Sequence, residues 1–279
     1  MEIYSRIRDM QAKVRELKAE GLSIGYVPTM GALHEGHISL LRRSDEENNI
    51  SVCSIFVNPI QFNNQIDLEK YPRTLKEDSE KLDKANCDIV FAPSVDEMYP
   101  DKVSESYDFG LLEKLMEGAL RPGHFNGVAV VVKRLFDICM PDKAYFGEKD
   151  FQQLMVIRAL VKQENIPVKI IGCPIIREPD GLAMSSRNVR LTPGERRIAP
   201  EIFKTLDMMK EKAGKKNIKE ILTEAENQLE QHPGVKIDYI QIVDESTLVP
   251  ITNWDETDNI RAFVALFLGE VRLIDNMRL

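Results

Sequence analysis

Short apolar runs alternate with longer amphipathic stretches through the first two-thirds of the chain. Short runs that are rich in Val and Ile and bounded by turn residues are typical of buried strands, whereas apolar positions at helical spacing are typical of helices. The pattern predicts strands at residues 22–27, 51–57, 88–92, 144–146 and 168–172. It predicts helices at residues 36–47, from residue 74 onward, at 128–140 and at 150–164.

Strands that are separated by helices of this length are joined by right-handed crossovers, which place the strands parallel to one another. The chain is therefore predicted to be an α/β protein with a doubly wound, mostly parallel sheet. The start of one helix carries an additional signal. Thr74 is followed three residues later by Glu77, which predicts a capping box in which each side chain meets the other residue's backbone donor.

The character of the sequence changes after about residue 175. Two helical segments come first and β-structure follows, at residues 193–213, 218–231, 235–243 and 260–279. The last of these segments reads as a hairpin that turns at Gly269-Glu270. Helices followed by antiparallel strands are typical of a separate α+β domain. We therefore expect a larger α/β domain at residues 1–175 and a smaller α+β domain at residues 176–279.

Charge and cysteine content narrow the class of protein. A net charge of -8 opposes general nucleic-acid binding, which requires clustered Lys and Arg. The four cysteines lie far apart without a CxxC pair, which argues against a structural zinc site and a disulfide framework. The N-terminus is charged and helical in pattern, and no apolar run approaches the roughly 20 residues that span a bilayer. These features predict a reduced, cytoplasmic protein.

The segment from Met30 to His37, MGALHEGH, lies where a predicted strand gives way to a helix. Open parallel sheets place their ligand crevice at such junctions, and a helix N-terminus favours phosphate. Gly31 permits a tight turn, and Gly36 lets the backbone approach a ligand closely. His34 and His37 are three residues apart and could donate to the same phosphoryl group. A site is favoured over ordinary loop histidines because the pair frames a glycine at this junction.

Two further segments offer cations near polar groups. Ser185, Ser186 and Arg187 in the loop MSSRN suit a polyphosphate, but taken alone an ordinary surface loop is the favoured interpretation. In combination with the HxGH segment the loop suggests a second contact to a nucleotide. In FGEKDFQQ, Lys149 could bring a point charge to phosphate, and Gln153 lies one turn into the predicted helix. A capped helix with a solvated lysine is an equally good interpretation of this second segment.

A fourth strand end, SIFVNPIQF, supplies two neutral polar side chains. Asn58 and Gln61 follow the predicted strand directly, and Gln61 lies between two apolar residues. This environment suits a small hydroxy acid better than a charged macromolecule. The alternative is a turn that Asn58-Pro59 initiates.

Taken together, these segments resemble the pantothenate synthetase (pantoate–β-alanine ligase) family. The resemblance rests on GYVPTMGALHEGHISLL, FVNPIQF, YPRT, LRPGHFNGV, AYFGEKDFQQ and IIREPDGLAMSSRN, which occur in the family's order and cover most of the chain before residue 188. It implies a Rossmann-like N-terminal domain, a smaller C-terminal lid, a homodimer, and membership of the nucleotidylyltransferase superfamily with the HxGH motif. The substrates it implies are ATP, pantoate and β-alanine.

The resemblance also assigns expected roles to individual residues. His37 is the expected proton donor, Gln61 is expected to meet both pantoate and β-alanine, and Gln153 is expected to hold pantoate. The expected ATP contacts are Met30, Gly31, Ala32, Leu33, His34, Glu35, Gly36 and His37, then Gly147, Glu148, Lys149 and Asp150, then Ile176, Met184, Ser185, Ser186 and Arg187. Asn58 is a further candidate for substrate binding.

The chemistry expected of such a ligase starts from a carboxylate, which is a poor electrophile. Pantoate would attack the α-phosphorus of ATP to give pantoyl adenylate and pyrophosphate, and the amine of β-alanine would then expel AMP. His34, His37, Lys149 and Arg187, with Mg²⁺, would offset the charge that gathers on the phosphoryl oxygens. Asp78 and Asp150 are the candidate Mg²⁺ ligands.

Two other interpretations stay open at the level of the sequence. An adenylyltransferase would use the same HxGH and MSSR segments but would release a stable adenylylated product. A nucleotide-binding regulator on the same fold would need no Lys149, Gln61 and Gln153 beside the histidines and is disfavoured for that reason. A tRNA-charging role is opposed by the acidic charge and by the missing anticodon-type domain.

Overall fold

A computed structural model describes residues 1–63 and 65–279. The chain divides into two compact units. The N-terminal unit comprises residues 1–113, 117–148 and 153–174, and the C-terminal unit comprises residues 114–116, 149–152 and 175–279. Within the described part of the chain, no helix is long and apolar enough to cross a membrane.

The N-terminal unit is built on a six-stranded sheet in the order β1-β4-β3-β2-β5-β6, and every neighbouring pair is parallel. The strands are β1 (Glu2–Tyr4), β2 (Ile24–Thr29), β3 (Ile50–Ile55), β4 (Ile89–Phe91), β5 (Lys143–Gly147) and β6 (Lys169–Cys173). The predicted α/β fold class is therefore confirmed. The order reverses between β2 and β5, which are neighbours although β3 and β4 lie between them in the sequence.

Helices cover both faces of this sheet. Tyr26 of β2 is fully buried and meets Phe136 of α7 (His124–Cys139), with ring centroids 6.2 Å apart. Val27, the next residue, belongs to a core cluster with Leu41 of α2 (Glu35–Glu47). Because successive strand residues point to opposite faces, α2 and α7 must cover different faces. The other α-helices before residue 175 are α1 (Ile7–Ala19), α3 (Gln65–Glu69), α4 (Leu75–Lys84), α5 (Val95–Met98), α6 (Met116–Leu120) and α8 (Phe151–Gln163).

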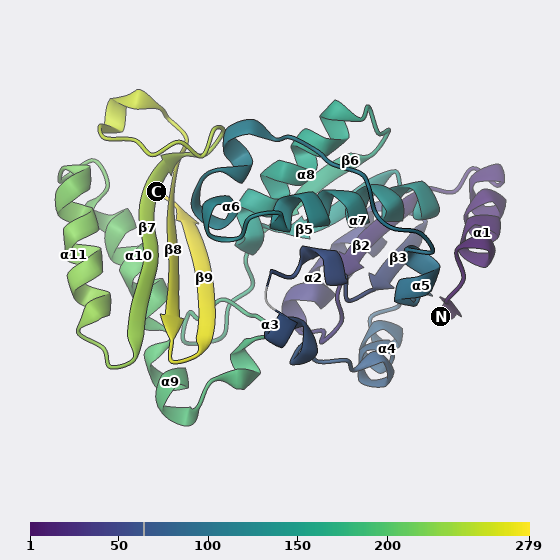
Figure 1. Ribbon diagram of the computed structural model, residues 1–279, viewed down its shortest axis with the longest axis horizontal. Coiled ribbons are helices and arrows are strands. Elements are labelled where there is room, and N and C mark those ends of the chain that lie inside the picture. Colours follow the sequence, from purple (N-terminus) through teal and green to yellow (C-terminus); the bar gives the residue numbers. More distant parts are fainter. Residues whose placement is uncertain (64) are drawn as a thin grey trace. The chain divides into compact units, whose positions relative to one another are not determined.

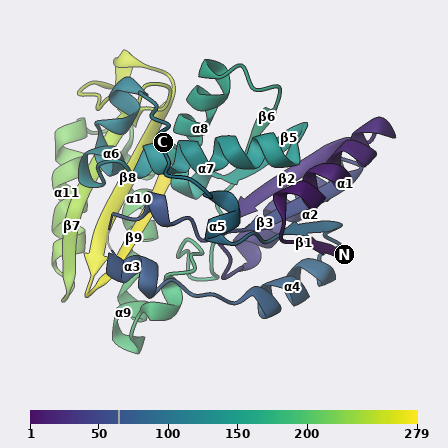
Figure 2. The ribbon, with the colours of Figure 1, turned by 45° about the vertical axis from the view of Figure 1, so that its right-hand side comes forward.

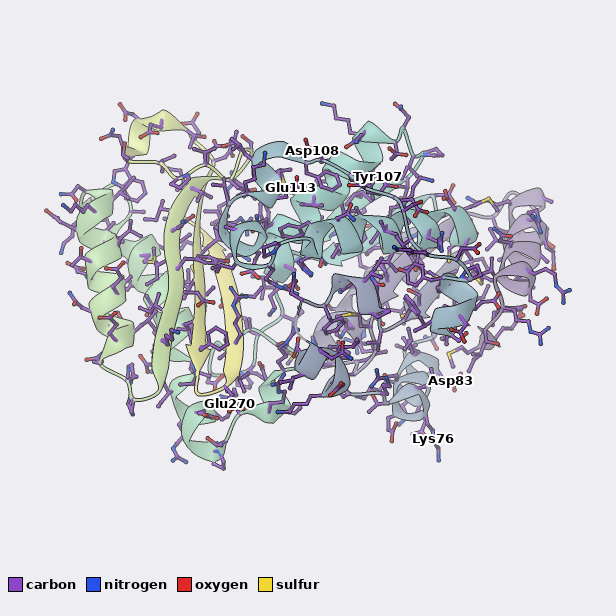
Figure 3. The ribbon with its side chains drawn as sticks, viewed as in Figure 1. Lys76, Asp83, Tyr107, Asp108, Glu113 and Glu270 are labelled. Atoms are coloured by element: carbon purple, nitrogen blue, oxygen red, sulfur yellow. The ribbon has the colours of Figure 1, made fainter. Side chains whose placement is uncertain are left out.

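The C-terminal unit consists of a three-stranded antiparallel sheet and the helices that pack against it. Strands β7 (Val235–Asp244), β8 (Ile260–Leu268) and β9 (Val271–Arg278) run side by side, with α10 (Glu201–Lys212) and α11 (Ile218–Glu230) packed against them (Figure 1; Figure 2). Leu206, Ile221 and Leu266 are at most 1% exposed and lie in the core between helices and sheet. The predicted hairpin is confirmed, and Glu270 is labelled at its turn in Figure 3.

Two predictions of where helices and strands lie were wrong. The first residues were expected to be helical, but β1 precedes α1 and pairs with β4. A three-residue strand is too short to show a period of its own. The helix predicted over 193–213 is divided into α9 (Pro193–Ile198) and α10. Pro200 lies at the division and lacks the N–H that would continue the helical hydrogen bonds.

Candidate active site

The reversal of strand order places two of the predicted segments at neighbouring strand ends. Met30–His37 follows β2, and Gly147 ends β5 and is followed by Glu148. In open α/β sheets the crevice at this switch point is the usual ligand site. The sheet thus brings the HxGH segment and the start of the GEKD segment to the same edge.

A buried carboxylate holds the turn that precedes the two histidines. Gly31 and Ala32 have positive φ values of 85° and 51°, and in this turn the N–H groups of Ala32 and Leu33 point toward the same acceptor. That acceptor is the side chain of Asp78, which accepts from the N–H of Ala32 at 2.9 Å and from the N–H of Leu33 at 2.8 Å. Asp78 is 0% exposed. These two N–H groups therefore hold a side chain of α4, not a phosphate.

The same helix holds the turn by a second contact. Lys81 of α4 donates from Nζ to the carbonyl oxygen of Leu33 at 2.5 Å. The Thr74 hydroxyl donates to Asp78 at 3.0 Å and makes no cap with the backbone, so the predicted Thr74–Glu77 capping box is wrong. The physical reason is backbone conformation: Thr74 has φ −125° and ψ 42°, outside the extended region that an N-cap residue usually adopts, and its hydroxyl meets Asp78 instead of the first turn.

His34 and His37 form a reciprocal cap at the start of α2. Nδ1 of His34 accepts from the N–H of Gly36 at 3.1 Å, and Nδ1 of His37 accepts from the N–H of His34 at 3.3 Å. The two ring centroids are 4.1 Å apart. Because each Nδ1 is an acceptor, each neutral ring carries its hydrogen on Nε2. The cap thus fixes both tautomers and presents each ring as an Nε2–H donor.

Gln61 lies in a buried polar cluster beside Met30. Its Oε1 accepts from Asn58 at 3.0 Å, and its Nε2 lies 3.1 Å from the sulfur of Met30. Asn58 is 1% exposed, also donates to the carbonyl oxygen of Gly127, and accepts from the Tyr99 hydroxyl. The amide of Asn58 is thus engaged at both ends. These contacts indicate that Asn58 orients Gln61, which differs from the substrate contact that the sequence suggested.

The motif LRPGHFNGV contains two positioning residues that the sequence reasoning missed. His124 Nδ1 donates to the carbonyl oxygen of Gln61 at 2.8 Å, and His124 is 5% exposed. A Cβ on Gly127 would lie 2.5 Å from the carbonyl oxygen of Ile60 and 2.8 Å from Cα of Gln61. Only glycine lets the turn that carries Gln61 lie this close to α7. A histidine followed three residues later by glycine at the start of an apolar helix was the available signal.

A cavity of about 270 Å³ opens at the carboxyl ends of β2, β3 and β4. Its lining includes Met30 and Gly31, the apolar side chains of Phe56 and Val57, and Arg73. Pockets that bind drug-sized ligands are roughly 300–1,000 Å³, so this one suits a small acid better than a whole nucleotide. Through Met30 the cavity adjoins Gln61.

The remaining predicted residues are distributed over both units. In the C-terminal unit, the carbonyl oxygen of Ile176 accepts from the N–H of Met184 at 3.0 Å, which brings these two predicted residues together. The Ser185 hydroxyl accepts from the N–H of Arg187 at 3.2 Å and so shapes the loop. Ser186 is half-buried in the same loop.

Lys149 also belongs to the C-terminal unit and is largely shielded from solvent. Its side chain is 19% exposed, with Nζ 3.9 Å from a carboxylate oxygen of Asp150. Gln153 lies in α8 within the N-terminal unit and is half-buried. No hydrogen bond joins the Gln153 amide to any residue that the structure describes, so a substrate could use it.

The candidate Mg²⁺ ligands do not form a metal site. Across residues 1–63 and 65–279, no group of three or more His, Cys, Asp or Glu side chains is placed to hold a metal ion. Both oxygens of Asp78 accept hydrogen bonds from the turn, and the side chain of Asp150 is 52% exposed. These residues do not fit Mg²⁺ coordination by the protein alone.

Comparison with known proteins gives a consistent result over the whole chain. The family model described as pantoate-beta-alanine ligase matches residues 2–278. A pantothenate synthetase of Bacteroides thetaiotaomicron is 48% identical over 278 residues, which cover 100% of this chain and 99% of the relative. A pantothenate synthetase of Azobacteroides pseudotrichonymphae is 50% identical, with 99% of each chain covered.

Solved structures agree with the sequence relatives. The crystal structure of pantothenate synthetase from Thermus thermophilus matches with a TM-score of 0.93 at 44% identity and covers 99% of both chains. A pantoate-beta-alanine ligase from Francisella tularensis, complexed with beta-gamma ATP and beta-alanine, matches with a TM-score of 0.84 at 38% identity. That match covers 100% of this chain and 97% of the other.

Proposed function

Because the chain belongs to the pantoate–β-alanine ligase family, we propose that it joins pantoate to β-alanine through a pantoyl adenylate formed from ATP. A carboxylate oxygen of pantoate attacks the α-phosphorus, and the bond from that phosphorus to the pyrophosphate oxygen breaks. The amine of β-alanine then attacks the acyl carbon, loses a proton and displaces AMP. Pantothenate, AMP and pyrophosphate are the products.

The observation that carries this proposal is the histidine pair at the sheet's switch point. His34 and His37 have their Nδ1 atoms bound within the cap, so each neutral ring carries its hydrogen on Nε2. Donors fixed before the substrate arrives stabilise the negative charge that gathers on phosphoryl oxygens during adenylyl transfer. His37 is the proton donor in this proposal, and His34 is the second phosphate contact.

The cations and the amides take the remaining roles. Lys149 and Arg187 offset charge on the nucleotide, and the rest of Met30–His37, Gly147, Glu148, Asp150, Ile176, Met184, Ser185 and Ser186 complete the ATP contacts. Gln61, oriented by Asn58 and His124, meets pantoate and β-alanine. Gln153 holds pantoate. The cavity beside Met30 receives the small acids, with the guanidinium of Arg73 available to a carboxylate.

Mg²⁺ enters this proposal as part of the nucleotide. Mg²⁺ keeps several waters and is commonly held by substrate phosphates with one or two carboxylates, so a protein cage is not required. When bound to ATP it neutralises phosphate charge. The protein's own part is to position ATP and pantoate and to donate hydrogen bonds from the two imidazoles to phosphoryl oxygens.

The F. tularensis ligase complexed with beta-gamma ATP and beta-alanine supports the same two ligands for this chain. We propose that the segment 176–279 forms a domain that acts as a lid over residues 1–175, with Ser185 and Ser186 on the loop that excludes water. An acyl adenylate is hydrolysed readily, so exclusion of water protects it.

We propose further that the protein is a cytoplasmic homodimer, as the family resemblance implies. All four cysteines are free and buried, which fits a reducing compartment. Light scattering on a size-exclusion column at micromolar concentration should give twice the mass of one chain. A mass of one chain at that concentration would contradict the homodimer.

A rapid-quench assay with ATP, Mg²⁺ and pantoate tests the proposed reaction. Without β-alanine we expect one equivalent of pyrophosphate and an enzyme-bound pantoyl adenylate. Addition of β-alanine should then release AMP and the amide. A stable adenylylated product with no response to the amine would instead support an adenylyltransferase, and absence of pantoate-dependent pyrophosphate would refute the ligase.

A further inference from the structure

We propose that Asn276, on the last strand of the chain, is a positioning residue for adenylate formation because it fixes the backbone of Lys149. This inference rests on the proposed function, in which Lys149 offsets charge on the nucleotide. It adds a residue that lies outside every motif discussed above and that does not itself touch substrate.

The Asn276 side chain is clamped between two partners. It is 1% exposed, and its Nδ2 donates to the carbonyl oxygen of Lys149 at 2.9 Å. Its Oδ1 accepts from Nη1 of Arg261 at 2.6 Å. A carbonyl can only accept and a guanidinium can only donate, so these partners allow one orientation of the amide. The hydrogen bond from Asn276 therefore fixes the backbone of Lys149 relative to β9.

Arg261, which donates to the side-chain amide of Asn276, is itself buried and fixed by contacts on two sides. It is 5% exposed, and its guanidinium carbon lies 3.9 Å from the ring centroid of Phe151. Two of its nitrogens lie 3.2 and 3.3 Å from a carboxylate oxygen of Glu245. Phe151 follows Lys149 by two residues. The segment with Lys149 is thus held twice, through its backbone by Asn276 and through a neighbouring ring by Arg261.

The neighbouring residue of β9 holds the other nucleotide segment. Asp275 is 4% exposed and receives two hydrogen bonds from Arg177, at 2.5 and 3.0 Å. Arg177 also donates to the carbonyl oxygen of Gly181 and pairs through its backbone with Ala183, just before the MSSR loop. Successive residues of one strand therefore fasten Lys149 and the base of the loop with Arg187.

A purely structural role would not favour this arrangement. Charged and amide groups lose hydration when buried, and apolar residues of similar volume often give equal or greater stability at such positions. The sheet around them has an apolar core in which Leu206, Ile221 and Leu266 are fully buried. A polar array at β9 is thus better explained by the need to place Lys149 and Arg187 reproducibly.

Asn276→Asp separates the two contacts of this residue. The aspartate keeps an acceptor for Arg261 and replaces the donor to Lys149 by an oxygen. We expect pantoate-dependent exchange of pyrophosphate into ATP to fall roughly 10- to 100-fold, since a displacement of about 1 Å can cost this much. Single-turnover attack of β-alanine on preformed, enzyme-bound pantoyl adenylate should stay within about twofold of wild type.

Two comparisons make the result specific. Asp238→Asn removes an ion pair between Asp238 and Arg272, whose Nε and Oδ2 atoms are 2.7 Å apart. This pair lies in the same sheet and includes none of the residues that contact Lys149 or Arg177, so the variant should leave both half-reactions unchanged. If Asn276 acts through Lys149, the double variant Asn276→Asp/Lys149→Ala should exchange pyrophosphate at the rate of Lys149→Ala alone. Additive losses in this cycle would overturn the proposal.

The remaining outcomes are also decisive. Equal losses in both half-reactions together with a lowered unfolding temperature would show a structural role, and unchanged exchange by folded Asn276→Asp would remove the role altogether. Either result overturns the positioning proposal while wild-type exchange continues. Failure of the ligase assignment appears differently, as absence of pantoate-dependent exchange in the wild-type protein itself.

Discussion

At the residue scale, the two histidines of the HxGH segment contribute differently to the cap of α2. His34 is the N-cap of α2 and accepts from the N–H of Gly36, whereas His37 accepts through a longer contact from the backbone of His34. The cap fixes the tautomer of both rings. Stability and catalysis can therefore be separated by substitution.

We expect His34→Asn to keep the cap, because asparagine is a favoured N-cap residue, but to lose the Nε2–H donor. Pantoate-dependent pyrophosphate exchange should fall about 10²- to 10³-fold, and urea unfolding should change by less than about 0.5 kcal/mol. His34→Ala should lose the same activity and in addition about 1 kcal/mol of stability. Full exchange activity in His34→Asn would contradict the role given to this ring.

Asp78 is a buried side chain that holds the turn before the two histidines. We expect Asp78→Ala to lower the free energy of unfolding by roughly 2–5 kcal/mol, because the N–H groups of Ala32 and Leu33 would lose their acceptor in the interior. Lys76→Ala is the matched control, since Lys76 lies on the same helix and projects outward (Figure 3). Urea titration measures the free energy of unfolding of the two variants. Equal losses in Asp78→Ala and Lys76→Ala would contradict the role given to the Asp78 side chain.

At the element scale, α7 positions the turn that carries Gln61. Gly127→Ala would normally stabilise a helix by about 0.5–1 kcal/mol, but here the new Cβ would overlap Ile60 and Gln61. We therefore expect the opposite sign, a loss of stability, and a rise of at least about tenfold in KM for pantoate as Gln61 is displaced. Steady-state kinetics and thermal melting check this, and a more stable variant with normal KM would refute it.

Helix α2 is fastened to β5 by Glu47, which gives a pH-dependent contribution to stability. Hydrogen bonds from Arg43 and from the Tyr145 hydroxyl, with Lys143 nearby, lower the pKa of Glu47 to about 2. A carboxyl whose folded pKa is lowered stabilises the fold fully above its unfolded pKa, and the effect is lost as the pH falls through the folded value. The contribution should thus fade between about pH 4.5 and pH 2.

The free energy of unfolding of wild type and of Glu47→Gln should therefore converge in acid. We expect the wild-type advantage at about pH 6 to shrink markedly by about pH 2.5, measured by urea titration at each pH. Exchange activity per folded molecule should be normal in the variant. An advantage of constant size across this range would show that Glu47 is not the titrating group.

At the scale of the whole molecule, the sequence predicts what depends on local periodicity. The strands β2, β3, β4, β5 and β6 and the C-terminal hairpin were predictable because each is a compact apolar run beside turn residues. The HxGH segment was predictable because a glycine and two histidines lie at a strand-to-helix junction. Strand β1 was not, since three residues carry no period.

Contacts between distant residues account for most of what sequence reasoning missed. Asp78 binds N–H groups 45 and 46 residues earlier in the chain. Nothing near it in the sequence indicates that it holds this turn, or that it accepts a hydrogen bond from the Thr74 hydroxyl. Asn276 binds Lys149 across 127 residues and reads in sequence as an ordinary strand residue. His124 was visible as part of a motif, but only its contact with the carbonyl oxygen of Gln61 gives it a role.

We propose that pantoate attacks the α-phosphorus of ATP at a site that contains His34 and His37. Pantoate labelled with ¹⁸O in both carboxylate oxygens tests this directly, because the attacking oxygen stays with phosphorus when the amine displaces AMP. Mass spectrometry of the products should find one ¹⁸O in every AMP and one retained in the amide carbonyl of pantothenate. Unlabelled AMP, or label in pyrophosphate or phosphate, would show that another phosphorus is attacked and would contradict the proposed pantoyl adenylate.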